Sequence, residues 1–150
     1  MPGYNCFGCS QDNPFGLHLC FYEDGNDIVT TWTPTENYQG WFDIVHGGIQ
    51  ALLLDETCGW VVTRKLQTAG VTSKMETQYL HPVSVSKSGT LTIRAHIREQ
   101  RRNIVFIDAI LADEEGQICT KACCTYFAYP QDKAKENLNF LTCNTEDESS

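Results

Sequence analysis

A histidine and two glycines precede the most apolar segment of the chain, and an aspartate follows nine residues after the histidine. These residues are His46, Gly47, Gly48 and Asp55. Paired glycines at a helix N-terminus leave backbone N–H groups bare, so a ligand oxygen can approach them at the positive end of the helix dipole. That is the geometry of an oxyanion hole, although a tight loop-to-helix turn would use the same glycines. The carboxylate further along the same helix favours the oxyanion hole over the simple turn.

Two adjacent carboxylates, Asp55 and Glu56, lie in the middle of this apolar segment. A carboxylate in an apolar setting costs desolvation energy unless it is paired. On a helical wheel Asp55 lies among small residues that leave room beside it, so Asp55 is the better candidate for a carboxylate facing a cleft. The alternative is that one or both acids reach a solvent-facing stripe with Gln50 and Thr57.

The spacing between the candidate oxyanion donor and the candidate base limits how they can cooperate. Gly47 and Asp55 are eight residues apart, which is about 12 Å along a helix axis. One carbonyl group cannot contact both residues of the same chain. We therefore expect Asp55 to come from an antiparallel helix of a second chain, in a two-fold dimer whose sites are shared.

A second motif, Cys6-Phe7-Gly8-Cys9, has the two-residue spacing of a zinc knuckle or a redox pair. A structural zinc ion needs four ligands, and the only nearby candidates are His18 and Cys20, which form no second motif of this kind. We assign no metal to the candidate active site. Whether Cys6 and Cys9 bind a metal or are structural stays open.

The helix that would carry the candidate active site is predicted from Gly47 to Lys65, with basic residues in its last turn, where the helix dipole is negative. Its apolar residues spread around the whole circumference, which predicts a buried helix. Two strand candidates precede it and four follow it: Leu17–Tyr22, Ile28–Thr33, Val71–Leu80, Thr90–Arg98, Ile104–Ala112 and Gln117–Ala128. This order is typical of an α+β protein with an antiparallel sheet wrapped around one helix.

Length and charge limit the class of protein. The chain of 150 residues fits one domain, and its net charge of −8 argues against nucleic acid and anionic membranes as partners. Apolar runs are shorter than the about 18 residues of a membrane span, and the N-terminus lacks the features of a signal peptide, so we expect a soluble, cytoplasmic protein. We predict an irregular lead-in over residues 1–15, a single domain over 16–130, and an acidic tail over 131–150 that is mobile or partly helical.

The histidine–glycine–glycine motif with an aspartate nine residues after the histidine resembles the signature of hotdog-fold acyl-CoA thioesterases of the phenylacetate-pathway type. The segments Cys6–Cys9, Asn13–Leu17 and Tyr79–Pro82 are similar to other parts of these proteins, so the resemblance covers about residues 5–128. It implies a hotdog fold, an antiparallel sheet of five to six strands wrapped around one long central helix. It also implies hydrolysis of acyl-CoA without a cofactor, by a homodimer that commonly pairs into a dimer of dimers.

The resemblance implies roles for four residues of this sequence. Asp55 would be the general base that activates water, or the nucleophile. The Gly47 N–H would polarise the thioester carbonyl, and His46 would shape the turn. Thr72, at the start of the strand after the helix, would orient the water.

The substrate-binding residues follow the family less closely. Many relatives have Asn or Gln six residues before the histidine, where this chain has Gly40, so Asn37 and Gln39 are candidates to replace that amide. Coenzyme A needs positive charge for its phosphates, and Arg101 and Arg102 in a predicted turn are candidates to supply it. Ordinary solvated surface charge is the alternative for both arginines.

Two other functions fit the sequence less well. A hotdog dehydratase or hydratase resembles this chain in fold, but those enzymes use a histidine–carboxylate pair placed elsewhere. A non-catalytic acyl-thioester-binding hotdog protein would not need Asp55 and Thr72, although Gly40 favours it. The sequence leaves the acyl group of the substrate open.

Overall fold

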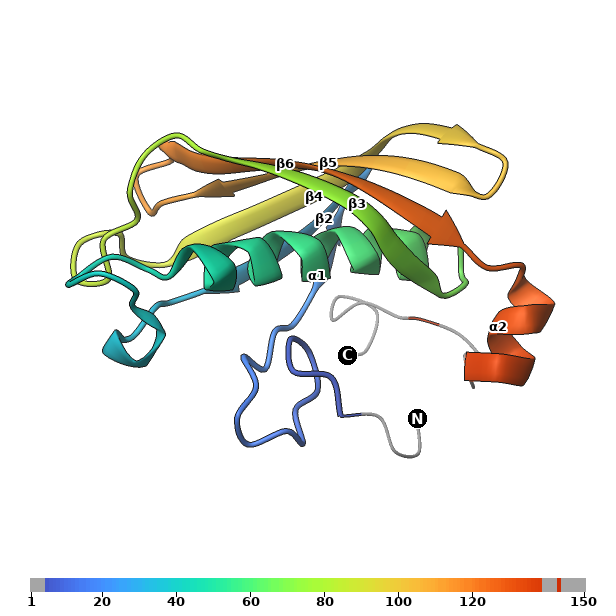
Figure 1. Cartoon of the computed structure of the whole chain (residues 1–150), viewed down its shortest axis with the longest axis horizontal. Coiled ribbons are helices and arrows are strands. Elements are labelled where there is room, and N and C mark those ends of the chain that lie inside the picture. The colour runs from blue at the N-terminus through green and yellow to red at the C-terminus, as the bar shows by residue number, and fades with distance from the viewer. Residues whose placement is uncertain (1–4, 139–142, 144–150) are drawn as a thin grey trace.

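The computed structural model describes residues 5–138 and residue 143 (Figure 1). Along the chain the elements are β1 (Tyr22–Asp24), β2 (Asp27–Trp32), the 3-10 turn η1 (Glu36–Tyr38), α1 (Gly47–Lys65), β3 (Gly70–Tyr79), β4 (Leu91–Arg101), β5 (Ile104–Ala112), β6 (Ile118–Ala128) and α2 (Gln131–Leu138). The predicted bounds of the long helix are confirmed, and so is the order of two strands before it and four after it.

The six strands form one antiparallel sheet in the order β1-β2-β4-β5-β6-β3, and helix α1 packs against one face of it (Figure 1). This is the predicted α+β hotdog fold, a six-stranded sheet packed on a long central helix. The two edges of the sheet differ in length, since β1 has three residues and β3 has ten. The longer edge strand, β3, is the one that follows the helix.

Helix α1 is held by the apolar face that it turns toward the sheet. Its fully buried apolar side chains are Leu53, Leu54, Cys58, Val61 and Val62. Gln50 and Thr57 are buried on this helix too, where the Gln50 side-chain carbonyl accepts from Thr120 and the Thr57 hydroxyl donates to the Leu53 carbonyl. The alternative that Gln50 and Thr57 line a solvent-facing stripe is therefore wrong, because both find hydrogen-bond partners inside the protein.

Of residues 17–22, predicted as a strand, only Tyr22 joins the sheet, as the first residue of β1. Leu17, Leu19 and Phe21 are buried and alternate with more exposed residues, as in a strand. However, the N–H groups of Leu17 and Leu19 donate to carbonyls of the lead-in at 2.9 Å, and Phe21 stacks on Trp60 of α1 with ring centroids 4.6 Å apart. The segment thus covers the side of the helix that faces away from the sheet (Figure 1).

A β-bulge interrupts strand β3 between Thr72 and Lys74. A bulge adds one residue and so changes which side chains share a face of the sheet. As a result Thr72 and Tyr79 both reach helix α1, although strict alternation would place them on opposite faces. The strand predicted over Val71–Leu80 is therefore present, but its side chains do not alternate regularly at this point.

The chain continues beyond the sheet into helix α2, which covers residues 131–138 of the predicted tail. The rest of that tail, residues 139–142 and 144–150, lies outside the described residues. In the part of the chain that is described, we find no helix with the length and apolar character needed to cross a membrane.

Candidate active site

The N-terminus of helix α1 is capped by the histidine of the glycine motif. His46 is the N-cap residue, and its Nδ1 accepts the Gly48 N–H at 2.8 Å. A Cβ at position 48 would come within 3.0 Å of the imidazole, so glycine permits this close approach. Because the Gly48 N–H is already paired, the expectation that both glycines present bare donors is wrong for Gly48.

The backbone N–H of Gly47, in contrast, is available as a hydrogen-bond donor. Among the residues that the structure describes, the Gly47 N–H has no hydrogen-bond acceptor, while the Gly47 carbonyl accepts from the Tyr79 hydroxyl at 2.8 Å. The Tyr79 ring lies across the start of the helix and is 52% exposed. The sequence analysis did not identify this tyrosine as a site residue, because a tyrosine in a strand carries no signal of a contact 32 residues away.

The loop before α1 carries the candidate amide donors. Asn37 lies in the turn η1, and the Gln39 side-chain carbonyl accepts the Asp43 N–H at 3.1 Å, which stabilises the loop. A Cβ on Gly40 would lie 3.5 Å from the His46 ring, so an amide side chain at this position would be adjacent to the imidazole. Gly40 supplies no such group, and the nearby Gln39 amide is partly engaged within its own loop.

Asp55 lies near the middle of α1 and is held by two hydroxyl groups. Thr72 donates to Oδ1 at 2.8 Å, and the Tyr126 hydroxyl lies 2.6 Å from the same oxygen and 2.7 Å from the Asp55 carbonyl. Within the described residues, Oδ2 accepts no hydrogen bond. The carboxylate is thus oriented through one oxygen, which leaves the other for a water molecule or a substrate.

Tyr126 is the residue of this cluster that the sequence analysis missed. It comes from strand β6, lies 71 residues from Asp55 in the chain, and belongs to no motif. Its side chain is buried, and this burial, together with the charge of Asp55, raises the pKa of the phenol. Tyr126 is therefore a neutral hydrogen-bond donor to the carboxylate.

Replacing Tyr126 with phenylalanine is expected to lower kcat by about 10- to 150-fold, since a hydrogen bond to a charged group contributes about 1.5–3 kcal/mol. The ring remains, so the thermal unfolding midpoint should show that the variant folds. Tyr22→Phe, an exposed tyrosine on β1, is the matched control. An unchanged kcat in Tyr126→Phe would show that this hydroxyl does not orient the base.

The two candidate phosphate-binding arginines lie where β4 ends, Arg101 as its last residue and Arg102 in the turn to β5. Both are exposed, and Arg101 Nε pairs with Glu99 Oε1 at 2.7 Å. The Asn103 carbonyl of this turn accepts the Ala128 N–H at 2.7 Å, at the end of β6. Arg101 and Arg102 therefore lie at the end of the sheet where β3 begins, and their exposure leaves them accessible to a ligand.

Comparison with known proteins assigns the chain to a family. The model of the thioesterase superfamily matches residues 42–120, which is more than half of the chain. The chain therefore belongs to the thioesterase superfamily. It is also 28% identical over 95 residues to Ta0293 of Thermoplasma acidophilum, whose name describes it as a candidate esterase, over 63% of this chain and 70% of that protein.

Solved structures with the same fold include several thioesterases. The thioesterase superfamily protein RHA08564 has a TM-score of 0.74 at 22% identity over 81% of this chain, which spans only 62% of that protein. A hypothetical thioesterase of Streptococcus pneumoniae, solved with coenzyme A, has a TM-score of 0.68 at 25% identity, over 75% of this chain and 90% of that one. PaaI of Escherichia coli, from the phenylacetic acid degradation operon, has a TM-score of 0.68 at 20% identity, over 77% and 82% of the two chains. The superfamily is thus shown, and the phenylacetate-pathway type stays a prediction.

Proposed function

We propose that the protein is an acyl-CoA thioesterase, which hydrolyses an acyl-CoA to the free acid and coenzyme A. The observation that carries this proposal is the Asp55 carboxylate, held by Thr72 and Tyr126. It lies on a helix whose first residue, Gly47, has an N–H without an acceptor among the residues that the structure describes. The pneumococcal thioesterase solved with coenzyme A supports it. That protein was also solved with an aspartate or a threonine changed to alanine, the same residue types as Asp55 and Thr72.

Two chemical routes fit this arrangement. As a general base, Asp55 would take a proton from water while the water oxygen bonds to the thioester carbonyl carbon. The C–S bond then breaks, and the proton passes to the sulfur so that coenzyme A leaves as a thiol. As a nucleophile, Asp55 would first form a mixed anhydride and expel the thiolate, and water would then hydrolyse the anhydride. In both routes the Gly47 N–H would stabilise the oxyanion, and Thr72 would orient the water.

The proposed site needs two chains, because Gly47 and Asp55 of one chain lie about 12 Å apart along α1. Strand β3 offers a place for the second chain. It is a ten-residue edge strand, and most of its side chains are exposed. A long open edge of this kind favours pairing with another strand, and a second copy of the chain brings an identical one.

The register of such pairing would join the two halves of the site. The two-fold axis of an antiparallel pairing of β3 with its copy passes through a residue that lies opposite its own copy. With the axis at Glu76, and with the bulge between Thr72 and Lys74 counted as one position, Thr72 of one chain lies opposite Tyr79 of the other. Within each chain Thr72 holds Asp55, and Tyr79 holds Gly47. The pairing would therefore bring Asp55 of one chain toward Gly47 of the second chain.

The remaining candidate residues would bind substrate around this pair. The Asn37 and Gln39 amides lie in the loop before the oxyanion donor. Exposed Arg101 and Arg102 would meet the phosphates of coenzyme A at the end of the sheet where β3 begins. A dimer of dimers would place further copies at the outer faces without changing these roles.

A thiol-release assay over acyl-CoAs of short, medium and long chain, and with aromatic acyl groups, tests the proposed activity. We expect release well above the uncatalysed rate for at least one acyl group, with kcat in the range of about 1–10³ s⁻¹. The same assay identifies the acyl group. Absence of release from every substrate, together with tight binding of coenzyme A, would instead identify a non-catalytic acyl-thioester binder, which Gly40 favours.

A further inference from the structure

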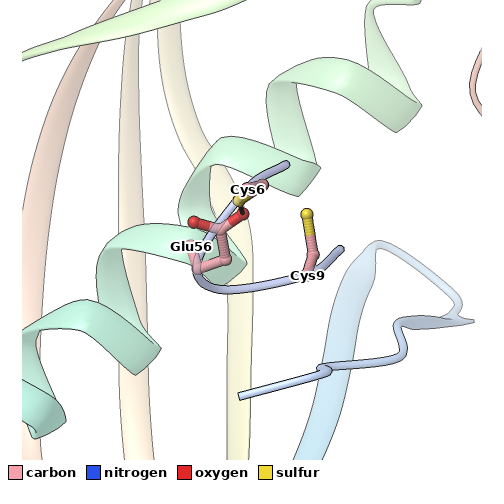
Figure 2. A group of neighbouring side chains, drawn as sticks. All are labelled: Cys6, Cys9 and Glu56. Carbon is pink, nitrogen blue, oxygen red and sulfur yellow. Dashed lines mark hydrogen bonds between the residues drawn. The ribbon is translucent and has the colours of Figure 1, made fainter. Parts of the chain in front are cut away.

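Two cysteine thiols of the lead-in lie beside a carboxylate of helix α1 (Figure 2). The Cys6 thiol donates to Glu56 Oε1 at 3.2 Å. The sulfur atoms of Cys6 and Cys9 and a carboxylate oxygen of Glu56 all lie within 4.8 Å of one another. Glu56 is half-buried here, so the carboxylate next to Asp55 faces the lead-in and is not part of a solvent-facing stripe.

The backbone of the lead-in is shaped around this cluster. Gly8, between the two cysteines, is buried against Glu56, and a Cβ at position 8 would come within 2.7 Å of its carboxyl carbon. The Ser10 N–H donates to the Cys6 carbonyl at 3.1 Å and closes the turn. The turn therefore brings both thiols to one point of the helix.

The charges of the cluster are consistent with a cation between these groups. Hydrogen bonding by the Cys9 thiol and by backbone amides lowers the pKa of Cys6 to about 4. Burial, followed by the charge of Cys6, raises the pKa of Glu56 to about 7. Two sulfur atoms and a carboxylate oxygen at one point of the helix are donor types that zinc takes in proteins.

We propose that Cys6, Cys9 and Glu56 bind a zinc ion, which fastens the lead-in to helix α1. Zinc is bound tetrahedrally by thiolates at about 2.3 Å and by carboxylate oxygens at about 2.0–2.2 Å, so neighbouring ligand atoms stand about 3.5–3.8 Å apart. The two sulfur atoms and the carboxylate oxygen lie within 4.8 Å of one another, so their separations exceed those of a zinc site by no more than about 1 Å. A water molecule completes the four ligands, and the helix supplies the third protein ligand in place of His18 or Cys20.

This site is separate from the proposed hydrolysis. Glu56 directly follows Asp55 in α1, but Asp55 is held by hydroxyls of β3 and β6, whereas Glu56 contacts the lead-in. The ion would therefore stabilise the docking of the lead-in onto the helix and would not contact the reacting thioester. Failure of the thiol-release assay and failure of zinc binding are thus independent results.

Titration of the full-length, reduced, metal-free protein with Co²⁺ and then Zn²⁺ tests the proposal. We expect one Co²⁺ per chain, thiolate-to-cobalt charge-transfer absorption, the intense visible bands of a tetrahedral site, and loss of both on addition of Zn²⁺. Zn²⁺ should also raise the thermal unfolding midpoint. Cys123→Ser, which removes an exposed thiol elsewhere in the sheet, is the matched control and should bind like the wild type.

The ligand variants give the decisive results. Cys6→Ser or Cys9→Ser should lose about half of the charge-transfer intensity and weaken Zn²⁺ binding by more than about 100-fold, and Glu56→Gln should weaken it by about 10- to 100-fold with the charge-transfer band retained. Wild-type Co²⁺ spectra without thiolate bands would overturn the proposal, whether or not the variants fold. A Glu56→Gln variant that binds Zn²⁺ with wild-type affinity would also overturn it. The same holds if the reduced protein binds no metal and reoxidises to a Cys6–Cys9 disulfide.

Discussion

Replacing Asp55 with asparagine is expected to lower kcat by about 10²–10⁴-fold, while KM stays near the wild-type value. Asparagine has the same shape, and its side-chain carbonyl can still accept from Thr72 and Tyr126, so the helix and its contacts should be retained. What is lost is the negative oxygen that would take a proton from water or attack the thioester. Steady-state kinetics on the substrate found in the thiol-release assay measures the change.

The matched control is Asp108→Asn. Asp108 lies on β5 and pairs with Arg98 at 3.2 Å, while its neighbours along the strand, Ile107 and Ala109, are buried in the core. The same chemical change there removes a carboxylate from the other face of the sheet and should leave kcat within about twofold, because surface ion pairs contribute little to stability. Activity that survives in Asp55→Asn, or equal losses in both variants, would contradict the assignment of Asp55.

The long helix and most strands could be predicted because their signals are local. Apolar residues from Gly47 onward, glycines at the start and basic residues at the end determine the bounds of α1, and the structure has the same bounds. Strand β5 also has its predicted bounds, Ile104–Ala112, since turn residues flank an apolar run. The resemblance added the hotdog fold, which alternation alone does not specify.

The missed features depend on contacts between distant parts of the chain. Tyr126 reaches Asp55 across 71 residues, and Cys6 reaches Glu56 across 50, without any spacing that would indicate either contact. The bulge after Thr72 turns that side chain toward the helix, although the local pattern reads as simple alternation. Leu17 and Leu19, in the first predicted strand, donate their N–H groups to the lead-in and not to the sheet.

The shared site predicts that two inactive variants restore activity in a mixed dimer. One variant carries Asp55→Asn, and the other carries Gly47→Pro, which removes the proposed oxyanion donor. Because proline could disturb the start of α1, this variant must first be shown to fold and to dimerise. Gly47→Ala is the matched comparison: its Cβ would lie 3.5 Å from Tyr79 and the N–H is kept, so it should be far more active than Gly47→Pro.

Measuring thiol release after the two variants are unfolded together in equal amounts and reassembled tests the central claim most directly. Half of the dimers would be mixed, and in each of them one site receives both substitutions and the other receives neither. About a quarter of the wild-type activity per site should therefore return, although each variant alone stays inactive. If mass spectrometry shows mixed dimers and no activity returns, Gly47 and Asp55 do not act together across two chains, and the proposed shared site is wrong.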